Sequence, residues 1–178
     1  QRQREIGWIH AWMQIAARCG ARCVRVIAGD AEPGAAGDWR DQEAVQISAE
    51  GLRHLAGVGR QMGLRVITEN FRALGGRAGA LNAILDLCEG AVGLCVDFGN
   101  FKGPDKYDEL AALLPRATSV HAKADFREEL QMDRTDFDRC LQLARDAAFA
   151  GPYSLIFSSP GDEWEGVAKT QEVVEAWL

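Results

Sequence analysis

The chain contains the stretch Gly93-Leu94-Cys95-Val96-Asp97-Phe98-Gly99-Asn100, in which a short hydrophobic run ends in polar residues. Hydrophobic runs of about four to eight residues between turn signals are typical of strands buried in a parallel sheet. Four other runs of this kind occur in the chain, at residues 23–27, 64–68, 119–123 and 153–157. The sequence therefore predicts buried strands at these places and at residues 93–97.

Segments with helical spacing of apolar residues separate these strands. They predict helices over residues 5–19, 45–62, 78–88, 107–114, 137–149 and 163–177, and the Gly-, Ala- and Pro-rich residues 31–41 predict a loop. Alternating strands and helices are typical of a parallel sheet covered by helices, in one α/β domain over residues 1–178. A doubly wound sheet and a closed barrel share this pattern. The glycine motifs of nucleotide-binding folds are absent, which disfavours those folds.

The composition excludes several classes of protein. With 178 residues, of which 47% are hydrophobic, the chain is expected to be globular rather than disordered. Its net charge of -6 argues against a nucleic-acid partner, because such proteins normally present a basic face. No hydrophobic run reaches the roughly 18 residues of a membrane span, and the first residues do not form a signal peptide. The five cysteines lack a zinc-site pattern and predict free thiols in a reducing cytoplasm.

Polar residues mark the ends of three consecutive predicted strands. Glu69 follows the second strand, Asp97 ends the third and His121 lies in the fourth. Because the carboxyl ends of parallel strands face the ligand crevice, we expect these three side chains to converge. Two carboxylates and an imidazole suit a divalent cation such as Mn²⁺, Mg²⁺, Zn²⁺ or Co²⁺.

Three further residues are candidates to bind a substrate. Lys123 lies two residues after His121, so both side chains are expected on the same side of the strand. Its ammonium would there bind a substrate hydroxyl, carboxylate or phosphate. Asn100 is a hydrogen-bonding candidate in the loop after Asp97, and Trp39, in the Gly-rich loop, is the aromatic residue placed to cover a ligand.

Each of these residues also suits an ordinary structural role. A carboxylate at a strand end often caps the next helix, a single histidine is often packed in the core or at the rim, and Asn100 suits a turn. Lys123 is as well suited to a salt bridge with Asp97 or Asp125 as to a ligand. The tryptophans on predicted helices are expected to pack in the core or between helix and sheet rather than to bind a sugar: Trp8, Trp12, Trp164 and Trp177.

The ordered set of these motifs resembles the sugar phosphate isomerase/epimerase family, which has the xylose isomerase-like TIM barrel fold. The matching stretches, spread over nearly the whole chain, are residues 24–29, 69–70, 96–101, 121–123 and 161–167. The resemblance implies a (β/α)8 barrel of about 250 residues, represented here by its C-terminal five strands and their helices. On this expectation the three N-terminal strands, about 75 residues, are absent from the 178-residue chain.

The resemblance also implies roles for the residues at the strand ends. In that family one divalent metal is bound by Glu, Asp, His and Glu from the last four strands, and the first three correspond to Glu69, Asp97 and His121. The two glutamates act as acid and base beside a sugar carbonyl, so Glu69 is the expected catalytic residue. The fourth position falls on Ile156, whose alkyl side chain can neither bind a metal nor transfer a proton.

Two functions fit this pattern. The first is an enzyme of carbohydrate metabolism, a sugar or sugar phosphate isomerase, epimerase or related lyase, which uses a three-ligand metal site and Glu69 as base. The alternative is a catalytically degenerate member that binds a sugar-like ligand. Either is expected to be cytoplasmic, to bind a small molecule and no membrane, and to be compatible with a homo-oligomer. The apurinic-site endonuclease branch, which needs a basic DNA-binding face, does not suit a net charge of -6.

Overall fold

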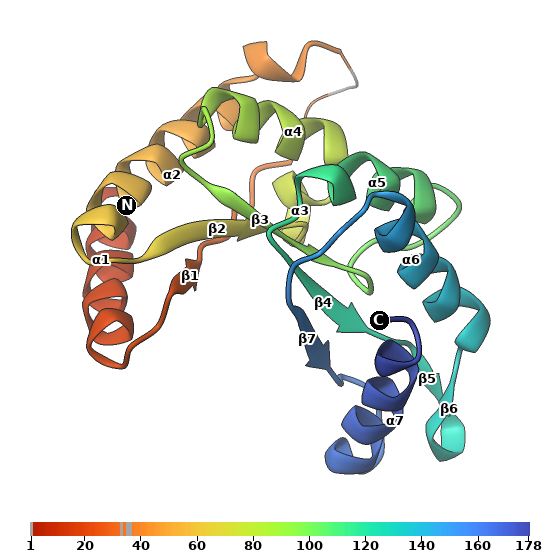
Figure 1. Ribbon diagram of the computed structural model, residues 1–178. Coiled ribbons are helices and arrows are strands. Elements are labelled where there is room, and N and C mark those ends of the chain that lie inside the picture. Colours follow the sequence, from red (N-terminus) through yellow and green to blue (C-terminus); the bar gives the residue numbers. More distant parts are fainter. Residues whose placement is uncertain (1, 33, 35–36) are drawn as a thin grey trace. The chain divides into compact units, whose positions relative to one another are not determined.

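The computed structural model describes residues 2–32, 34 and 37–178 (Figure 1). The chain forms two compact units, Gln1–Leu94 and Cys95–Leu178. Each unit contains parallel strands joined by helices, as the sequence predicts. Among the described residues, no helix combines the length and the apolar character that crossing a bilayer would need.

In the first unit a parallel pair of strands is covered by helices. Its elements are α1 (Arg2–Arg18), β1 (Cys23–Arg25), η1 (Trp39–Asp41), α2 (Glu43–Gln61), β2 (Arg65–Glu69), α3 (Arg72–Gly75) and α4 (Ala78–Leu87). Strand β1 pairs with β2, so that Val24 lies opposite Val66. Helix α2 packs against β2 and α4, and its buried residues Val45, Ala49 and Leu52 recur at helical spacing. This packing fixes the end of β2, where Glu69 lies.

The second unit contains three parallel strands. Its elements are the end of β3 (Gly93–Asp97), α5 (Lys106–Leu113), η2 (Leu114–Arg116), β4 (Ser119–Lys123), β5 (Phe126–Arg127), η3 (Glu128–Leu130), β6 (Gln131–Met132), α6 (Arg134–Asp146), β7 (Tyr153–Ile156) and α7 (Glu163–Glu175). Strand β4 pairs with β3 on one side and with β7 on the other.

Strand β4 has one buried, apolar face and one polar face. Val120 and Ala122 are fully buried, and α7 packs against β4 and β7. Because side chains alternate along a strand, His121 and Lys123 point to the opposite face, where both are partly exposed. The strand thus holds an imidazole and an ammonium side by side on one face.

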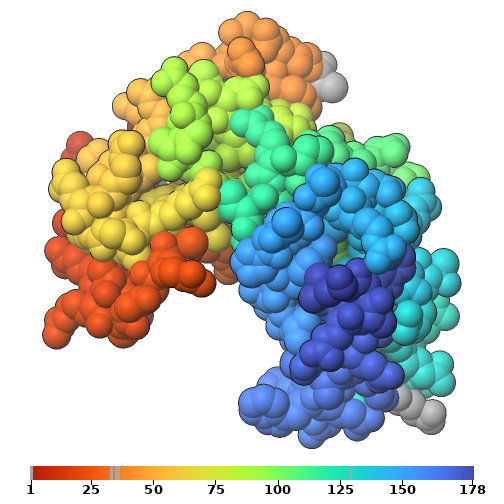
Figure 2. All heavy atoms as spheres, in the orientation of Figure 1, coloured from red at the N-terminus to blue at the C-terminus, as the bar shows by residue number. Residues whose placement is uncertain are grey.

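The C-terminal end of the second unit is tied to α6. Arg145 lies over the ring of Trp177 at 4.7 Å and donates a hydrogen bond to its carbonyl oxygen, and Figure 2 shows the end of the chain, in dark blue, against α6. The Trp177 indole also donates to Asp138 at 3.2 Å. This tryptophan therefore packs between elements, as expected.

The other helix tryptophans do not pack in the core. Trp8, Trp12 and Trp164 are 73%, 61% and 84% exposed, so the expectation for these three residues is wrong. Met13 is the one buried residue among those described in α1, and Trp8 and Trp12 lie on the exposed surface of the helix. Periodicity identifies a helix, but it does not decide which of its apolar residues face the core.

Candidate functional site

The register of β3 and β4 brings Asp97 and His121 together. The two residues lie opposite each other in the parallel pair, and Nδ1 of His121 is 3.3 Å from Oδ2 of Asp97. The other carboxylate oxygen, Oδ1, accepts a hydrogen bond of 2.7 Å from the backbone N–H of Gly99. This turn fixes the carboxylate, so that one oxygen is held by the backbone while the other faces the imidazole.

A cysteine adds a third donor atom to this face. Cys95 precedes Asp97 by two residues, so both side chains leave β3 on the same side. Its fully buried Sγ lies within 4.8 Å of a ring nitrogen of His121. The sequence did not single out Cys95, although the alternation along the strand points to it. Imidazole and thiolate are ligands that divalent transition-metal ions accept, and the Asp97 carboxylate lies beside the same imidazole.

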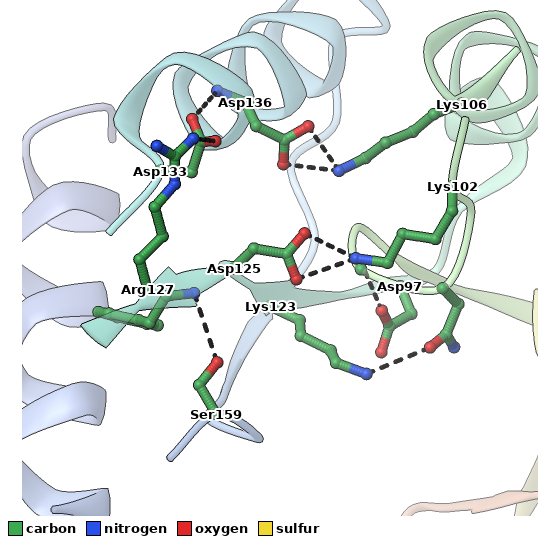
Figure 3. A network of polar contacts seen from close by, with 12 residues as sticks. Asp97, Lys102, Lys106, Lys123, Asp125, Arg127, Asp133, Asp136 and Ser159 are labelled. Atoms are coloured by element: carbon green, nitrogen blue, oxygen red, sulfur yellow. Dashed lines mark hydrogen bonds and ion pairs between the residues drawn. The ribbon is translucent and has the colours of Figure 1, made fainter. Parts of the chain in front are cut away.

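Lys123 and Asn100 lie beside this pair, from β4 and from the loop after β3. The Lys123 ammonium donates a hydrogen bond of 3.3 Å to Oδ1 of Asn100 (Figure 3). Lys123 does not form the alternative salt bridge with Asp97 or Asp125. Asp97 pairs with His121, and the Asp125 carboxylate accepts two hydrogen bonds from Lys102, at 2.6 and 2.9 Å. The structure therefore brings the two predicted substrate-binding residues into contact.

Glu69 lies at the end of β2 in the first unit and forms an ion pair with Arg25 of β1. The glutamate side chain is 1% exposed, whereas that of Arg25 is 46% exposed. Arg25 was not singled out from the sequence, although it is the one charged residue within the otherwise apolar predicted strand 23–27. The pair gives a buried carboxylate a charged hydrogen-bond donor, which holds it in place.

Trp39 belongs to the short helix η1 and packs against the first turn of α4. A Cβ at Gly79 would lie 2.3 Å from its indole nitrogen, so the glycine leaves the room that the ring occupies. This contact explains the position of Trp39 by packing. Its role as a cover for a ligand stays a prediction.

A second polar cluster joins α5 to α6. The nearly buried ammonium of Lys106 bonds both carboxylate oxygens of Asp136 at 2.6 Å (Figure 3). The Tyr107 hydroxyl donates to the same carboxylate at 2.8 Å. Burial and the bond to Asp136 raise the pKa of Tyr107 to about 12. Burial likewise raises the pKa of the neighbouring Cys140 to about 12, so this thiol stays protonated near neutral pH. We interpret the cluster as structural support for the two helices.

The family follows from a comparison over the whole chain. The family profile described as xylose isomerase-like TIM barrel matches residues 1–177. The chain belongs to the xylose isomerase-like TIM barrel family. The resemblance based on its motifs is thereby confirmed, as is the fold class of a partial TIM barrel.

Several solved structures share the fold of this chain. A xylose isomerase-like TIM barrel protein from Mycobacterium smegmatis, in complex with magnesium, is 16% identical with a TM-score of 0.70, over 98% of this chain and 67% of that one. D-Allulose 3-epimerase from a Methylomonas species is 16% identical with a TM-score of 0.72, over 97% and 69% of the two chains. An L-ribulose 3-epimerase is 14% identical with a TM-score of 0.74, over 99% and 67%. No curated protein matches the chain.

Proposed function

We propose that the chain is the metal-binding part of a sugar or sugar phosphate isomerase or epimerase. The observation that carries the proposal is the approach of Asp97 Oδ2 to His121 Nδ1, at 3.3 Å, on paired strands of this fold. Glu69 is the proposed third metal ligand for two reasons. It is the last residue of β2, just as Asp97 is the last residue of β3, and the family motif has a ligand at this position. Mn²⁺, Mg²⁺, Zn²⁺ and Co²⁺ suit these donors, and one relative was solved with magnesium.

Each site residue has a separate role in the proposed reaction. A bound divalent ion supplies a Lewis acid that polarises a sugar carbonyl or hydroxyl oxygen. Glu69 takes the proton from the carbon beside that carbonyl, and Arg25 keeps its carboxylate in position. Lys123 and Asn100 bind oxygen atoms of the substrate, and Trp39 covers it.

The alternative is a sugar-binding protein that has lost catalysis. The observation in its favour is Ile156, which β7 places directly opposite Lys123 and where the family carries its second acid/base glutamate. Without that carboxylate, a proton taken by Glu69 has no second side chain of this kind to return it. A cytoplasmic location and self-association stay predictions under either function.

The two functions are separated by hydrogen exchange in D₂O. With Mn²⁺ and D-allulose, the full-length protein is expected to introduce deuterium at the carbon beside the carbonyl, followed by NMR. Glu69→Gln should slow this exchange at least about 100-fold, since general acid–base catalysis contributes about 10²–10⁴ in rate. Glu163→Gln, at an exposed glutamate of α7, is the matched control and should exchange at the wild-type rate.

Binding of the sugar without any exchange would instead identify the degenerate, sugar-binding member. Exchange that persists in Glu69→Gln would contradict the role of Glu69 as the base.

A further inference from the structure

Lys123 and Ile156 are neighbours across two strands. The parallel pairing of β4 with β7 sets Lys123 opposite Ile156 and His121 opposite Ser154. Residues that lie opposite each other in paired strands point to the same face of the sheet. The side chain at position 156 therefore shares the face that carries His121 and the Lys123 ammonium.

The four lysines of the chain differ in their partners. Three of them form ion pairs: Lys102 with Asp125 at 2.6 Å, Lys106 with Asp136 at 2.6 Å, and Lys169 with Glu165 at 3.0 Å. Lys123 bonds only the neutral amide oxygen of Asn100, at 3.3 Å, among the described residues of the second unit. Lys123 is thus the lysine whose ammonium pairs with no described carboxylate of the second unit.

The position of the Lys123 side chain is set by the backbone beside it. A Cβ at Gly99 would lie 2.8 Å from Cδ and 2.9 Å from Cγ of Lys123, so the methylene stem occupies the space that the glycine leaves. The stem passes over the turn that also holds Asp97, and the ammonium ends at Asn100 (Figure 3). The ammonium is therefore held at Asn100, in the loop that follows Asp97.

A partly buried ammonium that pairs with no described carboxylate of its own unit favours a ligand that brings a negative charge. A glutamate at position 156 would supply that counter-ion from the facing strand, and Ile156 removes it. We propose that Lys123 binds an anionic group of the substrate, a carboxylate or a phosphate, so that the protein prefers a sugar acid or a sugar phosphate to a neutral sugar. This inference rests on the proposed function and names the substrate class of the same site.

The test compares three ligands that differ in one substituent, D-glucose, D-glucuronate and D-glucose 6-phosphate. Their binding to the full-length protein is measured by calorimetry. At least one of the two anions is expected to bind about tenfold more tightly than D-glucose, because a charge-assisted hydrogen bond is added. A preference for D-glucuronate identifies a carboxylate ligand, and a preference for D-glucose 6-phosphate identifies a phosphate.

Variants assign the preference to Lys123. Lys123→Gln keeps a donor for Asn100 and removes the charge, so the anions should bind no better than D-glucose, whereas Lys123→Arg should retain the preference. Ile156→Glu supplies a carboxylate opposite Lys123 and should also abolish it. Lys102→Gln is the matched control, because that exposed lysine already pairs with Asp125, and it should behave as wild type.

Two results would overturn the inference: equal or absent binding of all three ligands by the wild-type protein, or a preference that survives in Lys123→Gln. Neither depends on catalysis. Deuterium exchange that requires Glu69 would still support the proposed isomerase chemistry if the preference for anions is absent.

Discussion

At the scale of single residues, the least expected feature is the ion pair between Arg25 and Glu69. The sequence identified Glu69 from its place at a strand end, but it did not reveal Arg25, because pairing between strands leaves no fixed spacing along the chain. Asp97 and His121 were expected together, and the register of β3 and β4 places them opposite each other. Cys95 was missed because a cysteine in an apolar strand is most often a small buried side chain.

Removing Arg25 should destabilise the first unit. Arg25→Met leaves the 1% exposed carboxylate of Glu69 without its guanidinium partner, and a loss of about 1–3 kcal/mol in the free energy of unfolding is expected. Urea unfolding followed by circular dichroism measures this difference. Arg65→Met, at an exposed residue of the neighbouring strand β2, is the control and should change stability little.

At the scale of elements, hydrophobic periodicity was sufficient for the long segments. Strands β3 and β4 have the predicted bounds, and the predicted helices differ from the observed ones by a few residues at their ends. The short elements α3, β5 and β6 were missed, since two to four residues carry no measurable period. The β5–β6 hairpin leads directly to Asp133, which begins α6.

Asp133 should make stability depend on pH in the acidic range. Its carboxylate accepts hydrogen bonds from the backbone N–H of Asp136 and from Arg127, and these lower its pKa. A carboxyl group whose pKa is lower in the folded state adds stability above its unfolded value of about 3.9. That stability is lost as the pH falls through the folded pKa.

The prediction for Asp133 is tested by thermal unfolding at several pH values. Asp133→Ala removes the cap and should cost about 1 kcal/mol at pH 7. Asp133→Asn keeps an oxygen acceptor but does not titrate, so its difference from wild type should be present at pH 7 and vanish at low pH. A difference that is the same at every pH would show that the charge of Asp133 does not contribute.

At the scale of the whole molecule, the family assignment joins the fold to the proposed chemistry. The chain covers about two thirds of the length of relatives that include sugar 3-epimerases. The motifs predicted this family because they are carried by strand ends, which the fold keeps in order along the sequence. The substrate was not predictable in the same way, because loops and single exchanges such as Ile156 decide it.

The measurement that tests the metal site most directly is thermal unfolding of the full-length protein with and without Mn²⁺. A ligand that binds only the folded state stabilises it by about 2.7 kcal/mol at 100 times its dissociation constant, which corresponds to a rise in Tm of roughly 5 °C or more. We predict this rise for the wild-type protein and its loss in Glu69→Gln. An unchanged Tm with Mn²⁺, Mg²⁺, Zn²⁺ and Co²⁺, or a rise that persists in Glu69→Gln, would contradict the proposed site.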